Sequence, residues 1–153
     1  MSYCKHCEHC KLRNKSPFNG KFNYGCRNIS DSDTVNPTVQ HLEDILKRIN
    51  KKITKIKNYY NGNIRIDLSD NYLRENGILE LSKFLAGNKF LSAKITKLNL
   101  RHNRIKTKSF PYIRNILNTC PNVKIIIQVN RFNNEQVENE FKDVIQRIKY
   151  GVY

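Results

Sequence analysis

The apolar positions of this chain follow one frame three times. In each copy, apolar residues stand five and three positions before an Asn, and a third stands two positions after it. The copies occupy residues 66–73, 98–105 and 125–132. The apolar-x-apolar step predicts a short strand that turns alternate side chains toward one core. The Asn predicts a tight turn after the strand, where its amide can bond backbone groups that the turn leaves unpaired.

A helix is predicted after each Asn, because apolar residues at helical spacing begin seven positions beyond it. The three sets are Ile78, Leu81, Phe84 and Leu85; Phe110, Ile113, Ile116 and Leu117; and Val137, Phe141, Val144, Ile145 and Ile148. The aligned residues Asn71, Asn103 and Asn130 lie 32 and then 27 positions apart. Repetition on this scale is typical of a solenoid.

The repeated unit of strand, Asn turn and helix resembles the leucine-rich repeat family, in the long-repeat subclass similar to ribonuclease inhibitor. The resemblance covers residues 63–149, and residues 86–93 are the expected insertion in the longer first unit. Gly77 stands where the subclass has Gly, while Ser109 and Gln136 depart from it. The resemblance implies an α/β fold, a short solenoid with parallel strands on the concave face and helices on the convex face. The alternative is an ordinary α/β domain in which the pattern arises by chance.

A long amphipathic helix is predicted before the first unit. Asn36-Pro37 is a helix-start signal and Asn61-Gly62-Asn63 a stop signal, which gives a helix over 37–60. Its apolar stripe consists of Val39, Leu42, Leu46, Ile49, Ile53, Ile56 and Tyr60. The stripe either caps the first unit of the array or joins two chains in a coiled-coil dimer. We favour the cap, and we divide the chain into a Cys/His-rich segment (1–33), a basic capping helix (34–62) and three repeats (63–153).

The Cys/His-rich segment is the one candidate site of chemistry. Four thiols and two imidazoles fall within about two dozen residues, and a Cys-x2-Cys hook is a typical Zn²⁺-binding element. The predicted ligands are Cys4, Cys7, Cys10 and Cys26, with His6 or His9 able to replace one of them. Such a metal would supply folding energy to a segment that has few apolar residues. The second hook of a zinc ribbon is missing, so an iron–sulfur cluster and a tail with free thiols stay open.

The net charge of +15 at pH 7 suits an anionic partner. The densest basic run lies on the predicted helix and includes Lys47, Arg48, Lys51, Lys52 and Lys55. This run is the candidate nucleic-acid-binding surface, although no stacking aromatic residue interrupts it before Tyr59.

The resemblance implies that side chains between the core positions of the strands recognise a protein. These residues are Arg65, Asp67, Ser69, Lys97, Asn99, Arg101, Lys124, Ile126 and Gln128. One column across the strands would be Arg65, Lys97 and Lys124, and the next Asp67, Asn99 and Ile126. A basic column beside a mixed one suits an acidic protein surface or a phosphate-bearing ligand.

No enzyme motif is present, and we expect no catalytic activity. Cys120 is expected in the core, while His41 and His102 have no evident catalytic partner in the sequence. The chain has neither a membrane-spanning apolar run nor a signal-peptide pattern, so we expect an intracellular protein of the cytoplasm or nucleus without a membrane partner. The expected function is a zinc-stabilised protein-binding module. The alternatives are an accessory protein on nucleic acid and a structural subunit of a larger assembly.

Overall fold

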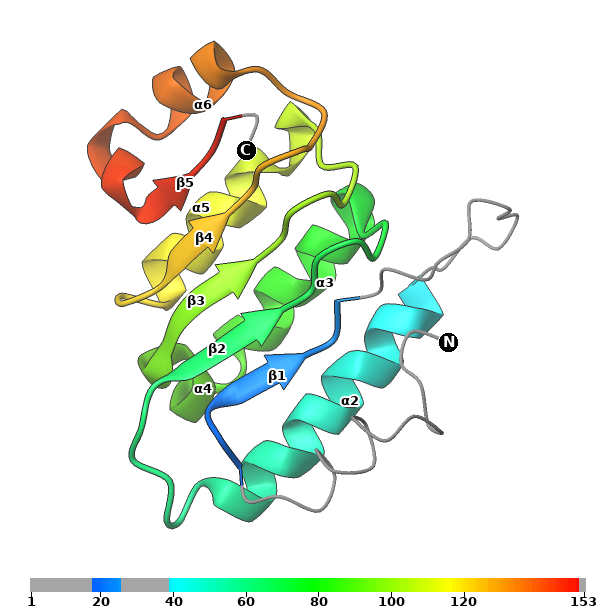
Figure 1. Cartoon of the computed structure of the whole chain (residues 1–153), viewed down its shortest axis with the longest axis vertical. Helices are drawn as coiled ribbons and strands as arrows, with labels where there is room; N and C mark the ends of the chain where they lie inside the picture. Colours follow the sequence, from blue (N-terminus) through cyan, green and yellow to red (C-terminus); the bar gives the residue numbers. More distant parts are fainter. Residues whose placement is uncertain (1–17, 26–38, 152–153) are drawn as a thin grey trace.

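The computed structural model describes residues 18–25 and 39–151. They form an open sheet of five parallel strands in the order β1-β2-β3-β4-β5 (Figure 1). The strands are β1 (Lys21–Asn23), β2 (Ile64–Asp67), β3 (Ile95–Asn99), β4 (Lys124–Ile126) and β5 (Ile148–Lys149). The predicted α/β class with parallel strands is confirmed. The sheet also has one strand on each side that the repeated frame did not predict.

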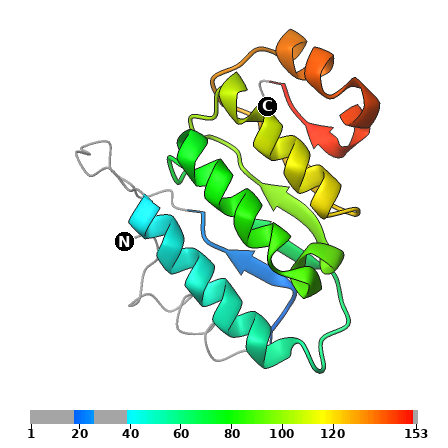
Figure 2. The same cartoon turned by 180° about the vertical axis from the view of Figure 1, so that it is seen from behind.

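Helices cover one face of this sheet, where α2, α3 and α5 lie side by side (Figure 2). The helical elements are α2 (Val39–Ile56), α3 (Arg74–Ala86), α4 (Lys89–Lys94), α5 (Phe110–Thr119) and α6 (Asn134–Glu140), with the 3-10 helices η1 (Thr107–Ser109) and η2 (Lys142–Arg147). The short helix α4 occupies the predicted insertion. Among the described residues, no helix lies on the opposite face, which we call the open face (Figure 1).

The core lies between the sheet and these helices. Alternate strand residues such as Ile64, Ile66 and Leu68 point into it and are no more than 1% exposed. Helix α2 contributes an apolar stripe in which Leu42, Ile45, Ile49, Ile53 and Ile56 are all buried. Ile45 was not in the predicted stripe, whereas Leu46, which was, is only partly buried. The stripe is therefore occupied within the chain, and a coiled-coil dimer through it would require α2 to leave the core.

The third unit differs from the predicted long helix. Helix α6 ends at Glu140, and after it η2 contains a non-helical residue, Val144, with φ −132°. Ile148, predicted at the end of the helix, lies instead in β5 and pairs with Ile125 of β4. That helix prediction was wrong, because pairing with β4 buries Ile148 to 5% exposure and extends the sheet by a strand.

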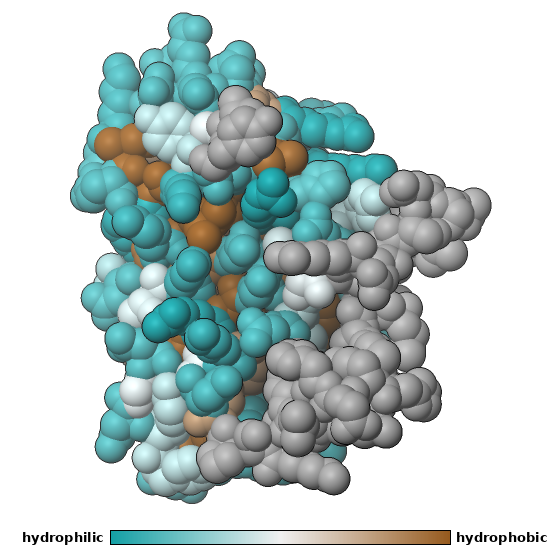
Figure 3. Space-filling view, in the orientation of Figure 1, coloured by the Kyte–Doolittle hydropathy of each residue, from teal (hydrophilic) through white to brown (hydrophobic). Residues whose placement is uncertain are grey.

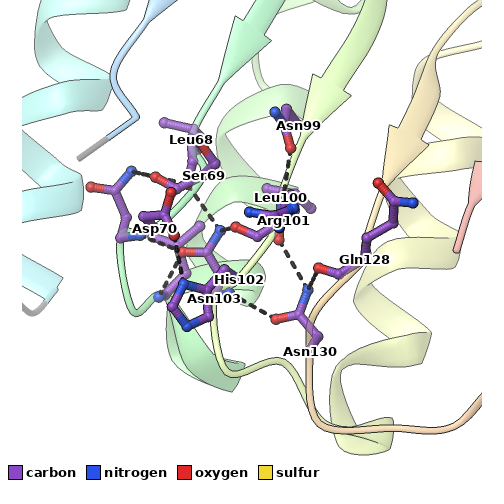
Figure 4. Close-up of polar contacts among 12 residues, drawn as sticks. Leu68, Ser69, Asp70, Asn99, Leu100, Arg101, His102, Asn103, Gln128 and Asn130 are labelled. Carbon is purple, nitrogen blue, oxygen red and sulfur yellow. Dashed lines mark hydrogen bonds and ion pairs between the residues drawn. The ribbon is translucent and has the colours of Figure 1, made fainter. Parts of the chain in front are cut away.

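The Asn side chains connect each turn to the turn before it. The amide nitrogen Nδ2 of Asn103 donates to the carbonyls of Leu68 at 2.9 Å and Arg101 at 3.3 Å (Figure 4). Its Oδ1 accepts from the backbone N–H groups of Asn71 at 2.8 Å and Leu73 at 3.3 Å. Since Asn103 is fully buried, this one side chain satisfies groups of two turns that water does not reach.

Asn130 repeats this arrangement one unit further along the chain. Its Oδ1 accepts from the N–H groups of Asn103 at 2.8 Å and Ile105 at 2.9 Å, and its Nδ2 donates to the Leu100 carbonyl at 3.1 Å (Figure 4). The three Asn residues thus form a continuous series of hydrogen bonds along the sheet. We call it the Asn ladder.

His41 ends the Asn ladder at Asn71. Nδ2 of Asn71 lies 2.9–3.1 Å from three carbonyl oxygens, those of Tyr24, Leu68 and Ser69. Three acceptors around Nδ2 fix the orientation of the amide, so its Oδ1 is the atom that lies 2.9 Å from Nε2 of His41. Nε2 of His41 therefore carries a hydrogen and donates it. This pairing could not be predicted from the sequence, because 29 residues separate His41 from Asn71 along the chain.

Two arginines attach the C-terminal segment to α5. Arg147 donates to three backbone carbonyls at the C-terminal end of α5 and just beyond, those of Leu117, Cys120 and Val123. Arg114, on α5 itself, makes two hydrogen bonds to the carboxylate of Asp143 at 2.9 and 3.0 Å. The carbonyls of Leu117 and Cys120 at the end of the helix are thus satisfied by a side chain rather than by a further turn.

Replacing Asn103 by Ala is expected to lower the free energy of unfolding by about 3 kcal/mol or more. The substitution leaves buried N–H and C=O groups without partners, and each such group costs about 1–3 kcal/mol. The measurement is urea denaturation followed by circular dichroism. Asn118→Ala is the matched control, because Asn118 is exposed on α5. A similar small loss in both variants would contradict the role of the Asn ladder.

The stability of the protein is expected to fall as the pH drops below about 6.5. Burial lowers the pKa of His41 from its ordinary value of 6.5, against the opposing effects of the Asn71 hydrogen bond and Asp44. The unfolded chain then binds a proton at a pH where folded His41 does not. The contribution of neutral His41 to the free energy of unfolding is therefore fully present above pH 6.5. It is lost as the pH falls from 6.5 toward the lowered pKa of folded His41.

Urea titrations at several pH values between 5 and 8 measure this dependence. His41→Gln keeps an amide donor near Asn71 but does not titrate, so its stability should vary less over this range. His102→Gln is the control, and it should retain the dependence contributed by His41. An unchanged pH dependence in His41→Gln would show that another group is responsible.

Candidate protein-binding surface

Parallel pairing places the predicted basic residues of the strands in line. Arg65 of β2 is opposite Lys97 of β3, and Lys97 is opposite Lys124 of β4. All three side chains are exposed. The register that the repeated frame predicted is confirmed, because equivalent positions of parallel strands meet across the sheet.

Lys21 extends this line to a fourth strand, since β1 pairs with β2 and places Lys21 opposite Arg65. The sequence did contain a signal, an alternation in which Phe22 and Tyr24 take the apolar positions. It was missed because Arg27, rather than Asn, stands five positions after Phe22. Phe22 is only 4% exposed, so its side chain belongs to the core like those of the other strands.

We call Lys21, Arg65, Lys97 and Lys124 the basic column. None of the four side chains makes an ion pair or hydrogen bond with another described residue, whereas Arg114 and Lys83 both lie within 4 Å of carboxylates. Neighbouring strands are about 4.8 Å apart, so the column places four positive charges within about 14 Å. Unpaired charge of one sign creates a potential that attracts anions.

The next row of outward positions contains acidic, basic, amide and apolar side chains, and two of these form hydrogen bonds within their own strand ends. It comprises Asn23, Asp67, Asn99, Ile126 and Lys149. The Oδ1 atom of Asp67 accepts from both the N–H of Ser69 at 2.9 Å and its hydroxyl at 2.7 Å. Asn99 likewise accepts from the N–H of Arg101 at 3.0 Å. These two side chains shape the ends of their strands.

Three of the predicted recognition residues are largely buried. Ser69, Ile126 and Gln128 are between 5% and 7% exposed, and Nε2 of Gln128 has no hydrogen-bond partner within 18–25 and 39–151. Arg101 is partly exposed beside them. The coloured part of Figure 3 accordingly shows hydrophilic side chains over most of the open face, with hydrophobic strips between them. The exposed charge of this face therefore comes mainly from the basic column.

The candidate nucleic-acid residues lie on a different element. Lys47, Arg48, Lys51 and Lys55 are exposed on α2. Lys52 is partly buried, and its ammonium lies 5.9 Å from the centre of the Phe18 ring. The structure thus has two separate basic surfaces, one on the open face and one on α2.

The predicted metal ligands Cys4, Cys7, Cys10 and Cys26, with His6 and His9, lie outside the described residues. Within 18–25 and 39–151, no group of three or more His, Cys, Asp or Glu side chains is arranged to hold a metal ion. The zinc site stays a prediction from the sequence.

Cys120, His102 and Ser69 are described residues whose side chains could be reactive, and each of them is buried or hydrogen-bonded within the fold. Cys120 is fully buried, and burial raises the pKa of its thiol to about 11, so the thiol is protonated at neutral pH. Nδ1 of His102 lies 2.5 Å from Oδ1 of Asp70, which joins the first two turns at the surface (Figure 4). The neighbouring Ser69 hydroxyl donates to Asp67 rather than toward this pair.

No protein-family model, curated protein or solved structure matches the chain. The resemblance to leucine-rich repeats therefore depends on the residues of the repeated frame. No helix in the described part of the chain is both long enough and apolar enough to cross a bilayer.

Replacing Lys97 by Gln is expected to stabilise the fold by about 0.5 kcal/mol at low ionic strength, because Lys97 lies between two like charges. The gain should vanish in 0.5 M NaCl, where screening already weakens the repulsion. Thermal unfolding at both salt concentrations provides the measurement. Lys108→Gln, at an exposed position in η1, is the control. Equal effects of the two substitutions would show that the column carries no special repulsion.

Proposed function

We propose that this protein is a small intracellular protein-binding module, and that it binds an acidic protein through the open face of its sheet. The observation that carries the proposal is the basic column. Its four cations are exposed, have no partner among the described residues and lie on a face that no described helix covers. A partner that supplies carboxylates would relieve the repulsion within the column and gain from its potential.

We also propose that the scaffold is a short leucine-rich-repeat solenoid with α2 as its cap. Each unit adds one strand in register, and the Asn ladder connects each turn only to its neighbours. Nearest-neighbour contacts of this kind are typical of repeat architectures, which need terminal elements to cover their ends. Two features support the cap: the α2 stripe is buried, and His41 from α2 completes the last position of the ladder.

The zinc-stabilised N-terminal segment stays part of the proposal. Its support is the density of Cys and His in residues 4–26. We assign this segment a structural role, and we assign the binding of the partner to the sheet.

A nucleic-acid-associated function is the second candidate, and one observation favours it. Tyr59 is 64% exposed in the turn that begins after the end of α2 at Ile56, and an exposed aromatic ring in a basic segment can stack on a base. This function would use α2 rather than the open face, so the two candidates predict different sensitive residues.

Affinity capture from a lysate of the source cells tests the two candidates. We compare the wild-type protein with Arg65→Glu/Lys97→Glu on the open face and with Lys47→Glu/Lys51→Glu on α2. The proposal predicts that only the first pair abolishes capture of an acidic protein, and that nuclease treatment has no effect. Circular dichroism confirms that both variants are folded.

The opposite pattern would overturn the proposal. If the α2 pair abolishes capture and nuclease removes the captured material, the chain acts on nucleic acid. If the column pair captures the same proteins as the wild type, the open face is not the binding surface.

A further inference from the structure

The spacing of the basic column restricts the shape of the acidic partner, if the proposed function holds. From this spacing we infer that the partner presents an α-helix that lies across the strands, with a stripe of Asp or Glu side chains along the column.

The column matches the repeat of a helix. Strands about 4.8 Å apart place its four cations at about 0, 5, 10 and 14 Å along a line perpendicular to the strands. Helical residues i, i+3, i+7 and i+10 lie on one side and, at 1.5 Å per residue, at about 0, 4.5, 10.5 and 15 Å. Each acidic residue of such a stripe would face one cation.

An extended peptide fits the column less well. Side chains on one side of a strand recur every 6.6–6.8 Å, so four of them extend over about 20 Å. At the fourth residue the acidic side chain of the peptide is about 6 Å away from the fourth cation of the column. A lysine side chain reaches that far only if it bends along the strand of the peptide and away from its place in the column. An extended acidic segment would therefore pair with some of the cations and leave others without a partner.

At β2 the neighbouring row favours a narrow anionic stripe over a broad anionic surface, whereas at β5 the same row ends in the exposed Lys149. Asp67 is two residues along β2 from Arg65, so its carboxylate lies in the next row, about 7 Å from the column. A wide anionic surface, such as a nucleic-acid duplex or a lipid membrane, would meet this carboxylate as well as the cations. A single line of acidic side chains along the column would avoid it.

The open face also lacks the stacking side chains that single-stranded nucleic acid requires. Its outward positions on the described strands and strand ends contain no aromatic residue. They are Lys21, Asn23, Arg65, Asp67, Ser69, Lys97, Asn99, Arg101, Lys124, Ile126, Gln128 and Lys149. Charge pairing without base stacking fits a polypeptide helix better than an unpaired strand of nucleic acid.

Fluorescence anisotropy with synthetic peptides tests the inference on the full-length protein. The first probe is a labelled Ala-rich helical peptide with Glu at i, i+3, i+7 and i+10. The second has the same composition and helicity, but its four Glu residues are distributed around the helix. The third is an extended peptide of alternating Thr and Glu with the same charge. A single-stranded RNA and an RNA duplex are measured at the same salt concentration.

The stripe peptide is expected to bind about tenfold more tightly than the second and third probes, because only it can form four exposed ion pairs together. Arg65→Glu/Lys97→Glu should remove this difference by weakening the stripe peptide about tenfold. Lys47→Glu/Lys51→Glu, which reverses the same number of charges on α2, should leave the affinity within about twofold.

The other outcomes separate the inference from the proposed function. If all three peptides bind equally and their binding depends on the column, the inference of a helical partner is wrong, while the proposal that the open face binds an acidic protein is retained. If either RNA binds more tightly than the stripe peptide and depends on the column, both conclusions are overturned. If no peptide binds, the helix is likewise wrong, and the lysate capture then decides whether the column binds any protein.

Discussion

The turn at the end of each strand directs backbone N–H groups into the interior, where water does not reach them. The left-handed conformation of residues on either side of the Asn, such as Asp70 and Tyr72, gives this turn its shape. An amide side chain is suited to such a turn because it accepts at one atom and donates at the other. Asn103 therefore fixes the distance and register between two strands, and the alignment of the basic residues across the sheet depends on that register.

Much of the fold could be predicted because the strand, the Asn and the helix lie close together in each unit of the sequence. The two outer strands could not be predicted from the frame, since what makes them strands is contact with a distant neighbour. Ile148 follows Phe141, Val144 and Ile145 at helical spacing, and only its pairing with Ile125 decides that it is extended. Phe22 has the right alternation but no Asn five positions after it, so the local pattern does not distinguish it from a loop.

The sequence likewise predicted the alignment of the basic residues on the candidate surface, but it did not predict which side chains of that surface are exposed. The column of cations follows from register, which the repeated frame already contains. Exposure does not follow from the frame: Gln128 occupies the same position of its unit as Arg101, yet it is buried while Arg101 is partly exposed. The local bonds of Asp67 and the contact of His41 with Asn71 also depend on side-chain direction and on a tertiary approach. No spacing rule encodes these two features.

The Asn ladder has a direction, because every Asn reaches back to the turn of the unit before it. At Asn71 the imidazole of His41 occupies the place that two backbone N–H groups take in the later units, while Nδ2 still reaches back to the carbonyl of Tyr24. A duplicated unit inserted ahead of β2 would bring its own Asn to meet His41, and Asn71 would then accept from the backbone N–H groups of the new unit. A unit inserted after β4 would likewise supply an Asn to the turn that contains Asn130. Tandem duplication of this protein is thus chemically open to a unit that carries its own Asn, because each new Asn supplies one set of ladder contacts and receives the next.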